Sequence, residues 1–195
     1  MPVYASPNSM TNEYFRVLEK LVYDLDSLDD ESAVRRQVAL SIFQAVTTVE
    51  IFLNLYFRII VSEKEFCGQE PYFLKTIADR RSLDYKLKNW TKTILNKELK
   101  LDSGVGKSFT ELKNIRNSLM HFSSSHDTVD LPGARIQGML NIEIYERLKK
   151  EDAVNALEVA HEFICEIFRL RGVEESAIPH MLFLWSGKPP MQLQP

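Results

Sequence analysis

The chain contains little glycine, proline or cysteine: 7 Gly, 8 Pro and 2 Cys among 195 residues. Because residues that break helices are few and long segments follow the helical period, we expect a mostly helical protein. Cys67 and Cys165 are far apart and belong to no Cys-x-x-Cys pair, so we interpret them as small buried hydrophobes in a reducing compartment, with a disulfide as the alternative. The hydrophobic fraction of 45% is enough for the core of one domain.

Other common signals are also lacking. No basic region followed by an apolar run begins the chain, so no signal peptide is predicted. The most apolar stretch, Val49 to Val61, is interrupted by Glu50, Asn54 and Arg58, and we consider it too short and too polar to cross a bilayer. There is no internal repeat and no low-complexity tract. We therefore expect a soluble cytoplasmic protein with no membrane partner.

The net charge of −3 conceals an uneven distribution along the chain. Residues 1–74 carry 6 Lys/Arg against 11 Asp/Glu, residues 75–116 carry 11 against 5, and residues 117–195 carry 7 against 11. A basic segment on an acidic protein can attract nucleic acid locally. The alternative is that its lysines are simply the solvated faces of helices.

Apolar periodicity predicts an all-α protein of about five to six helices. A lead-in (1–9) and a tail (186–195) are expected to be flexible, and residues 10–185 to form a single domain. Residues 123–141 are predicted to form a long loop that can include a brief hairpin. The apolar segment 178–185 is predicted either to pack on the body of the domain or to form an oligomer contact. The first two helices are expected at 10–28 and 31–66, with Asp29 and Asp30 supplying the stop of the first and the N-cap of the second. Further helices are expected at 72–79, from Ser82, from Ser108 with a capping box to Glu111, and at 150–171 with Gly172 as the cap.

Polar residues spaced by four follow the second predicted helix at Glu50, Asn54 and Arg58. They form either a self-satisfied ladder on an exposed edge or a polar line that faces a site on a neighbouring helix. In the helix from Ser82, Lys86, Lys88, Lys92 and Lys97 are predicted on the outer face. The inner face of that helix is predicted to consist of Leu83, Leu87, Trp90, Ile94 and Leu95.

The main candidate site is Arg116-Asn117-Ser118-Leu119-Met120-His121. An arginine can stabilise charge on phosphoryl oxygens, and a histidine can move protons near neutral pH, so the two suit RNA cleavage without a metal. Five residues apart on an ideal helix, Arg116 and His121 diverge by about 140° and rise by about 7.5 Å. A twofold dimer would bring two such pairs together. The alternative is that Arg116 bridges to an acid such as Glu50, Asn117 caps a turn, and His121 hydrogen-bonds at the helix end.

The Arg116-Asn117-x-x-x-His121 motif resembles the Arg-(polar)-x(3–5)-His signature of the HEPN (higher eukaryotes and prokaryotes nucleotide-binding) superfamily. The motif's place near the end of a late helix is similar, as is the long apolar second helix with an Ala-rich stretch and a glutamate, here Ala39 to Glu50. The final helix, opening at Lys149 to Ala153, is also similar. The resemblance spans about residues 10–171 and implies an HEPN-like, up-and-down helical bundle that dimerises.

By this resemblance the chain is expected to be a metal-independent endoribonuclease, of toxin or phage-defence type, with its site shared between two copies. Arg116 would hold the scissile phosphate, His121 would act as general acid or base, and Asn117 would orient the phosphate or partner side chains. RNA, a second copy and an antitoxin or nucleotidyltransferase are the implied partners. Some toxin members carry a tyrosine two residues after the histidine, as the target of a nucleotidyltransferase antitoxin. This chain has Ser123 at that position, which weakens the expectation of such an antitoxin.

Three other patterns are weaker evidence for a functional site. Ser125, His126 and Asp127 are adjacent and cannot adopt triad geometry, and His121 with His126 lacks further ligands at metal-site spacing. Residues 102–106, with glycines at 104 and 106, do not match the P-loop pattern, so we interpret them as a connecting turn. We expect no metal and no cofactor. The rival function is a non-catalytic, dimeric helical interaction module or nucleotide-sensing module.

Overall fold

The computed structural model describes residues 4–63, 68, 72–73, 75, 77, 81–120, 127–139 and 142–189. This part of the chain is mostly helical, as the periodicity predicts, with one small two-stranded sheet. Short 3-10 turns occupy Asp24–Ser27 and Glu175–Ala177. The helices are α1 (Pro7–Tyr23), α2 (Glu31–Ser62), α4 (Leu83–Leu95), α5 (Gly104–Met120), α6 (Glu143–Glu146), α7 (Lys150–Arg171) and α8 (Ile178–Ser186).

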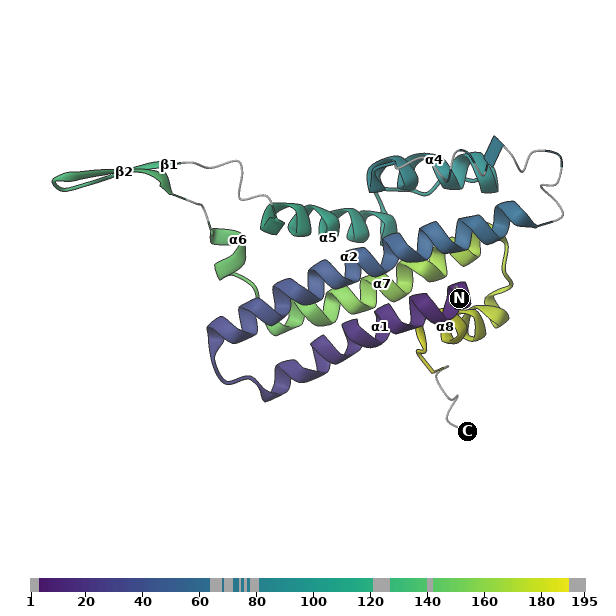
Figure 1. Cartoon of the computed structure of the whole chain (residues 1–195), viewed down its shortest axis with the longest axis horizontal. Coiled ribbons are helices and arrows are strands. Elements are labelled where there is room, and N and C mark those ends of the chain that lie inside the picture. Colours follow the sequence, from purple (N-terminus) through teal and green to yellow (C-terminus); the bar gives the residue numbers. More distant parts are fainter. Residues whose placement is uncertain are drawn as a thin grey trace.

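The centre of the molecule is made by α1, α2 and α7, which lie side by side along most of their lengths (Figure 1). Helix α5 packs against both α2 and α7, α4 packs against the same two helices, and α8 covers α1 and α7. Apolar side chains repeat every three to four residues on each helix and are removed from water together, which stabilises the bundle. The fully buried phenylalanines of this core are Phe15, Phe52, Phe57, Phe109, Phe163 and Phe168.

The helix ends agree with the sequence signals in several places. Asp30 caps α2, where its carboxylate accepts a 2.7 Å hydrogen bond from the Ala33 amide. Gly172 ends α7 at a φ of 90°, a left-handed conformation that glycine adopts without strain. Helix α1 begins at Pro7, inside the predicted lead-in, and Ser186, at the start of the predicted tail, is fully buried. Both boundaries of the folded part therefore lie further out than predicted.

Some predicted segments lie partly outside the described residues. Helix α2 is described to Ser62, and Cys67 is not among the described residues. Of the predicted helix at 72–79, residues 72, 73, 75 and 77 are described and are helical. Cys165 is a buried free cysteine, as expected for a small core residue. Burial raises the pKa of its thiol to about 11, so it stays protonated at neutral pH.

The predicted capping box at Ser108 and Glu111 is wrong. Helix α5 begins four residues earlier, at Gly104, and the Ser108 hydroxyl donates a 3.4 Å hydrogen bond to the Gly104 carbonyl within the helix. The two glycines at 104 and 106 suggested a turn, but Gly104 has a φ of 54° and Gly106 is helical. The Ser-x-x-Glu pattern is thus an ordinary pair of interior positions.

Gly106 is required by a close backbone approach. A Cβ atom added there would lie 2.0 Å from the Lys100 carbonyl oxygen, which belongs to backbone and cannot move aside easily. We expect Gly106→Ala to lower the free energy of unfolding by at least about 2 kcal/mol, measured by urea denaturation. The control is Gly104→Ala, where a Cβ meets nothing within 4 Å and only backbone strain of about 1 kcal/mol applies. A smaller loss at Gly106 than at Gly104 would contradict the packing.

The predicted loop at 123–141 contains the brief hairpin, with strands β1 (Asp127–Leu131) and β2 (Ala134–Met139). The strands pair antiparallel around Pro132 and Gly133, and Asp130 and Arg135 form a cross-strand ion pair of 3.1 Å. The hairpin projects away from the bundle (Figure 1). Every side chain described between residues 130 and 137 is exposed.

Helix α2 differs from the expectation about membranes. By length and composition alone, the helix is apolar enough to cross a bilayer, and it is the one such helix in the described part of the chain. However, 56% of its most apolar window is buried inside the bundle. A core helix of a globular protein has this character because it is covered on several sides.

Candidate functional site

The C-terminal turns of α5 carry the first two residues of the predicted site. Arg116 and Asn117 are both half-buried, while Met120, which ends the helix, is 54% exposed. One terminal nitrogen of Arg116, Nη1, lies 3.5 Å from the Met120 sulfur, which is a weak acceptor. The Arg116 Nε is buried and has no hydrogen-bond acceptor among the described residues.

Arg116 also has no carboxylate partner within the described ranges. The predicted alternative paired it with Glu50, but Glu50 forms an ion pair with Lys86 of α4 instead. By contrast, arginines 16, 35, 36, 135, 147, 169 and 171 each form an ion pair. A partly buried guanidinium without an anion retains donors that an incoming anionic group could satisfy.

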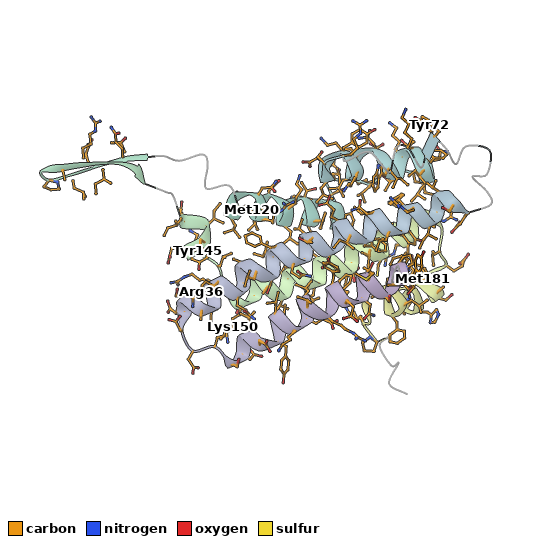
Figure 2. The ribbon with its side chains drawn as sticks, viewed as in Figure 1. Arg36, Tyr72, Met120, Tyr145, Lys150 and Met181 are labelled. Carbon is orange, nitrogen blue, oxygen red and sulfur yellow. The ribbon has the colours of Figure 1, made fainter. Side chains whose placement is uncertain are left out.

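His121 lies outside the described residues, so the structure gives no distance between its imidazole and Arg116. The described part of α5 ends one residue before it, at Met120. Of the motif, the structure therefore describes residues 116–120. Figure 2 shows Met120 at this end of α5, on the side of the bundle where Tyr145 of α6 lies, and α5 and α6 are in contact.

The basic segment is partly neutralised by ion pairs. Lys113, one turn before Arg116, is buried and pairs with Asp84 of α4, and Lys107 pairs with Glu111 at 3.8 Å. The prediction that Lys86 lies on the outer face of its helix is wrong, because its stem is buried against Trp90 and its ammonium reaches Glu50. Five exposed lysines of the segment form no ion pair among the described residues: Lys75, Lys88, Lys92, Lys97 and Lys100.

The polar line predicted on α2 does not behave as a self-contained ladder. Glu50 contacts α4 through Lys86, Asn54 is half-buried, and Arg58 is exposed. The line faces a neighbouring helix only at Glu50, where it serves to fix α4 against α2. No hydrogen bond or ion pair in the described part of the chain joins it to Arg116.

Two open hollows of about 880 Å³ each lie elsewhere on the surface. One is lined by Lys88, Lys100, Glu98 and Asp102 with neighbouring residues, and the other lies between the start of α2 and the start of α7. Neither lining includes Arg116 or Asn117. A single copy therefore presents the two residues on a helix surface rather than inside one of these hollows.

His161 of α7, which no sequence motif indicated as a functional residue, is 3% exposed. Its ring stacks on Phe15 of α1 with centroids 4.7 Å apart and an interplanar angle of 7°, and its Nε2 is buried without a partner among the described residues. Burial, together with the smaller effect of the positive charge of Lys188, lowers the pKa of His161 to about 3. Its spacing from Leu157 and Ile164 places it in the core register, which was the available signal.

Comparison of the chain with protein-family models, with curated proteins and with solved structures gives no significant match. Within the described residues, no three His, Cys, Asp or Glu side chains are grouped so that they could hold a metal ion. The function is consequently inferred from the residues of α5 and their surroundings.

Proposed function

We propose that the chain is a metal-independent endoribonuclease of HEPN type whose site is shared by two copies. The observation that carries the proposal is the half-buried Arg116, which has no carboxylate partner among the described residues and whose Nε has no acceptor. A phosphodiester supplies the missing anion, since its oxygens accept the charge-assisted hydrogen bonds that a guanidinium donates. The exposed lysines at 88, 92, 97 and 100 supply a positive surface for the rest of the RNA.

In this proposal His121 moves protons to and from the ribose 2′-hydroxyl or the leaving oxygen, and Asn117 orients the phosphate. The 2′-hydroxyl is the nucleophile, so a 2′,3′-cyclic phosphate forms as the 5′-oxygen bond breaks, and positioning supplies much of the rate. The proposal takes the site from two copies because Arg116 of one copy lies on a helix surface and lines neither of the two hollows of about 880 Å³. A twofold axis would place a second α5 opposite the first and close the site.

The test is incubation of the purified protein with labelled transfer RNA and single-stranded RNA in excess EDTA, beside the His121→Ala variant. We expect the wild type to cut RNA and leave cyclic-phosphate ends, and the variant to lose at least a hundredfold in rate because it lacks the proton carrier. Magnesium added back serves as the control for metal dependence. Cleavage at equal rates by both proteins would remove His121 from the chemistry, and loss of cleavage in EDTA alone would contradict a metal-independent reaction.

A second candidate function is a non-catalytic dimeric interaction or nucleotide-sensing module. It is favoured by the same position of Arg116, which lines neither of the two described hollows of about 880 Å³. This candidate predicts binding of RNA or a nucleotide without turnover, which filter binding in EDTA would detect. We propose a cytoplasmic location for either function, and the antitoxin or nucleotidyltransferase partner belongs to the first function only.

A further inference from the structure

The C-terminal segment Ile178–Pro189, here called the strap, comprises α8 and the three residues after it. It lies across α1 and α7 (Figure 1). The Asn8 side-chain amide donates a 3.5 Å hydrogen bond to the Leu184 carbonyl. Gly187 packs so closely on Asn12 that an added Cβ would be 2.8 Å from the Asn12 amide nitrogen. The strap is therefore held to α1 at two successive turns.

Underneath, the strap covers aromatic surface. Trp185 is 5% exposed and meets Phe52 and Tyr56 edge-on, with ring centroids 5.2 and 5.3 Å away. Both rings belong to α2, so release of the strap would expose the centre of the bundle. Apolar contact of this kind stabilises docking.

His161 lies where α1, α7 and the strap meet. Phe15, which stacks on its ring, is one helical turn from Asn12, and Asn12 contacts Gly187. The Nε2 atom is buried and has no hydrogen-bond partner, donor or acceptor, among the described residues. An imidazolium at this place would be both desolvated and unpaired.

The charged groups around His161 do not favour its protonation. From the strap, Lys188 acts on it with a positive charge. From α1, Glu19 is the carboxyl on which Lys188 also acts, and burial raises the pKa of that carboxyl. From α7 and α2, Cys165 and Tyr56 remain neutral, since burial raises their pKa values to about 11 and about 12.

We propose that the strap is an acid-sensitive latch, in which protonation of His161 releases residues 178–189 from α1 and α7 and uncovers the aromatic surface below Trp185. This device is independent of the proposed ribonuclease site, because it uses none of Arg116, Asn117 and His121. In the released state His161 is open to water and binds a proton at its ordinary pKa near 6.5, whereas in the docked state its pKa is about 3.

The direction of the effect follows from these two pKa values. Above pH 6.5 neither state binds the proton, so docking is strongest. As the pH falls from 6.5 toward 3, only the released state is protonated, and the docking equilibrium weakens about tenfold per pH unit, or about 30-fold between pH 8 and pH 5. Glu19, whose pKa burial raises, contributes with the opposite sign, so the effect must be assigned by variants of His161.

The test is amide hydrogen exchange of the full chain at pH 8 and pH 5, with rates corrected for the intrinsic pH dependence. We expect protection in residues 178–186 to fall about 30-fold while that of the α2 core falls much less. His161→Phe keeps a ring on Phe15 without a titrating group and should abolish the difference, and His161→Leu serves if the larger ring is not accommodated. The matched control is His180→Gln, which replaces an exposed histidine on α8 itself. This variant should keep the difference in protection between pH 8 and pH 5.

Fluorescence gives a second measurement. In a Trp90→Phe background Trp185 is the sole tryptophan, and its emission should shift to the red at low pH while the helical circular dichroism is retained. Three outcomes overturn the proposal: unchanged protection of α8 at pH 5, equal loss in α8 and α2, or the same loss in His161→Phe. The first removes the latch, the second indicates global unfolding, and the third assigns the proton to another group.

Discussion

Replacement of Arg116 by alanine is expected to slow RNA cleavage by about a hundredfold to a thousandfold, the cost of removing one donor that stabilises transition-state charge. Stability should change by less than about 1 kcal/mol, because the guanidinium forms no ion pair in the described structure and only a weak contact with Met120. Arg116→Lys retains the charge but not the paired donors, so it should remain well below wild type. Rates are measured with labelled RNA in EDTA, and stability by thermal unfolding.

Met120→Leu is the control for this experiment, since it removes the sulfur that Arg116 contacts and keeps the charge. It should retain most of the cleavage activity. If Arg116→Ala cuts RNA as fast as the wild type, the arginine does not act on the phosphate and the ribonuclease proposal fails. If Arg116→Ala unfolds at a much lower temperature, the arginine is structural.

A mixture of Arg116→Ala and His121→Ala tests whether the site is shared. If each site takes Arg116 from one copy and His121 from the other, half of the dimers in an equal mixture are mixed, and each has one intact site. About one quarter of wild-type activity should then return after subunit exchange. Activity no greater than that of the separate variants would indicate that both groups come from the same copy.

Removal of Glu50 is expected to cost about 2–3 kcal/mol of stability, the largest effect of any ion-pair change in the described structure. Lys86 is buried, with its side chain only 8% exposed, and its ammonium pairs with Glu50 and lies 5.6 Å from the Trp90 ring centroid. Glu50→Ala would leave this ammonium buried without a counterion, which is costly. The value lies below that of a fully buried pair because Glu50 is 33% exposed.

The contrast with the reciprocal variant distinguishes the mechanism. Lys86→Met removes the buried charge and keeps the apolar stem on Trp90, so it should cost less than about 1 kcal/mol. Asp84→Ala, which leaves Lys113 unpaired, should cost less than Glu50→Ala because Asp84 is 56% exposed. Urea denaturation of the three variants gives the comparison. A larger loss in Lys86→Met than in Glu50→Ala would show that packing, rather than an unpaired charge, dominates.

Lys86 also shows what sequence patterns can and cannot predict. The long apolar periods predicted α2, α5 and α7 well, since core spacing leaves a strong signal. Lys86 stands in that same spacing, three after Leu83 and four before Trp90, but its charge indicated an outer position. A long side chain can bury its stem and reach a partner on another helix, and that partner is set by the tertiary packing.

The helix starts and the site show the same division. The local signal at Asp30 was sufficient to predict a cap, whereas Ser108 and Glu111 matched a capping pattern in the interior of α5. In the site, Arg116 and Asn117 were predicted from the motif. That Glu50 pairs with Lys86 and not with Arg116 could not be predicted, because it depends on how α4 packs against α2. His161 was missed because its position in the core register gives no information about its pKa or its hydrogen-bond partners, which depend on the residues packed around it.

The hairpin between α5 and α6 has a consequence for how this bundle can vary. Its two strands run out and back, and α5 and α6, which flank it in the chain, are in contact. The hairpin therefore adds length without displacing the helices on either side. Segments of other lengths and shapes could be exchanged at Pro132 and Gly133 while the bundle is conserved. A scaffold of this kind can acquire new recognition elements beside Arg116 by insertion, without redesign of its core.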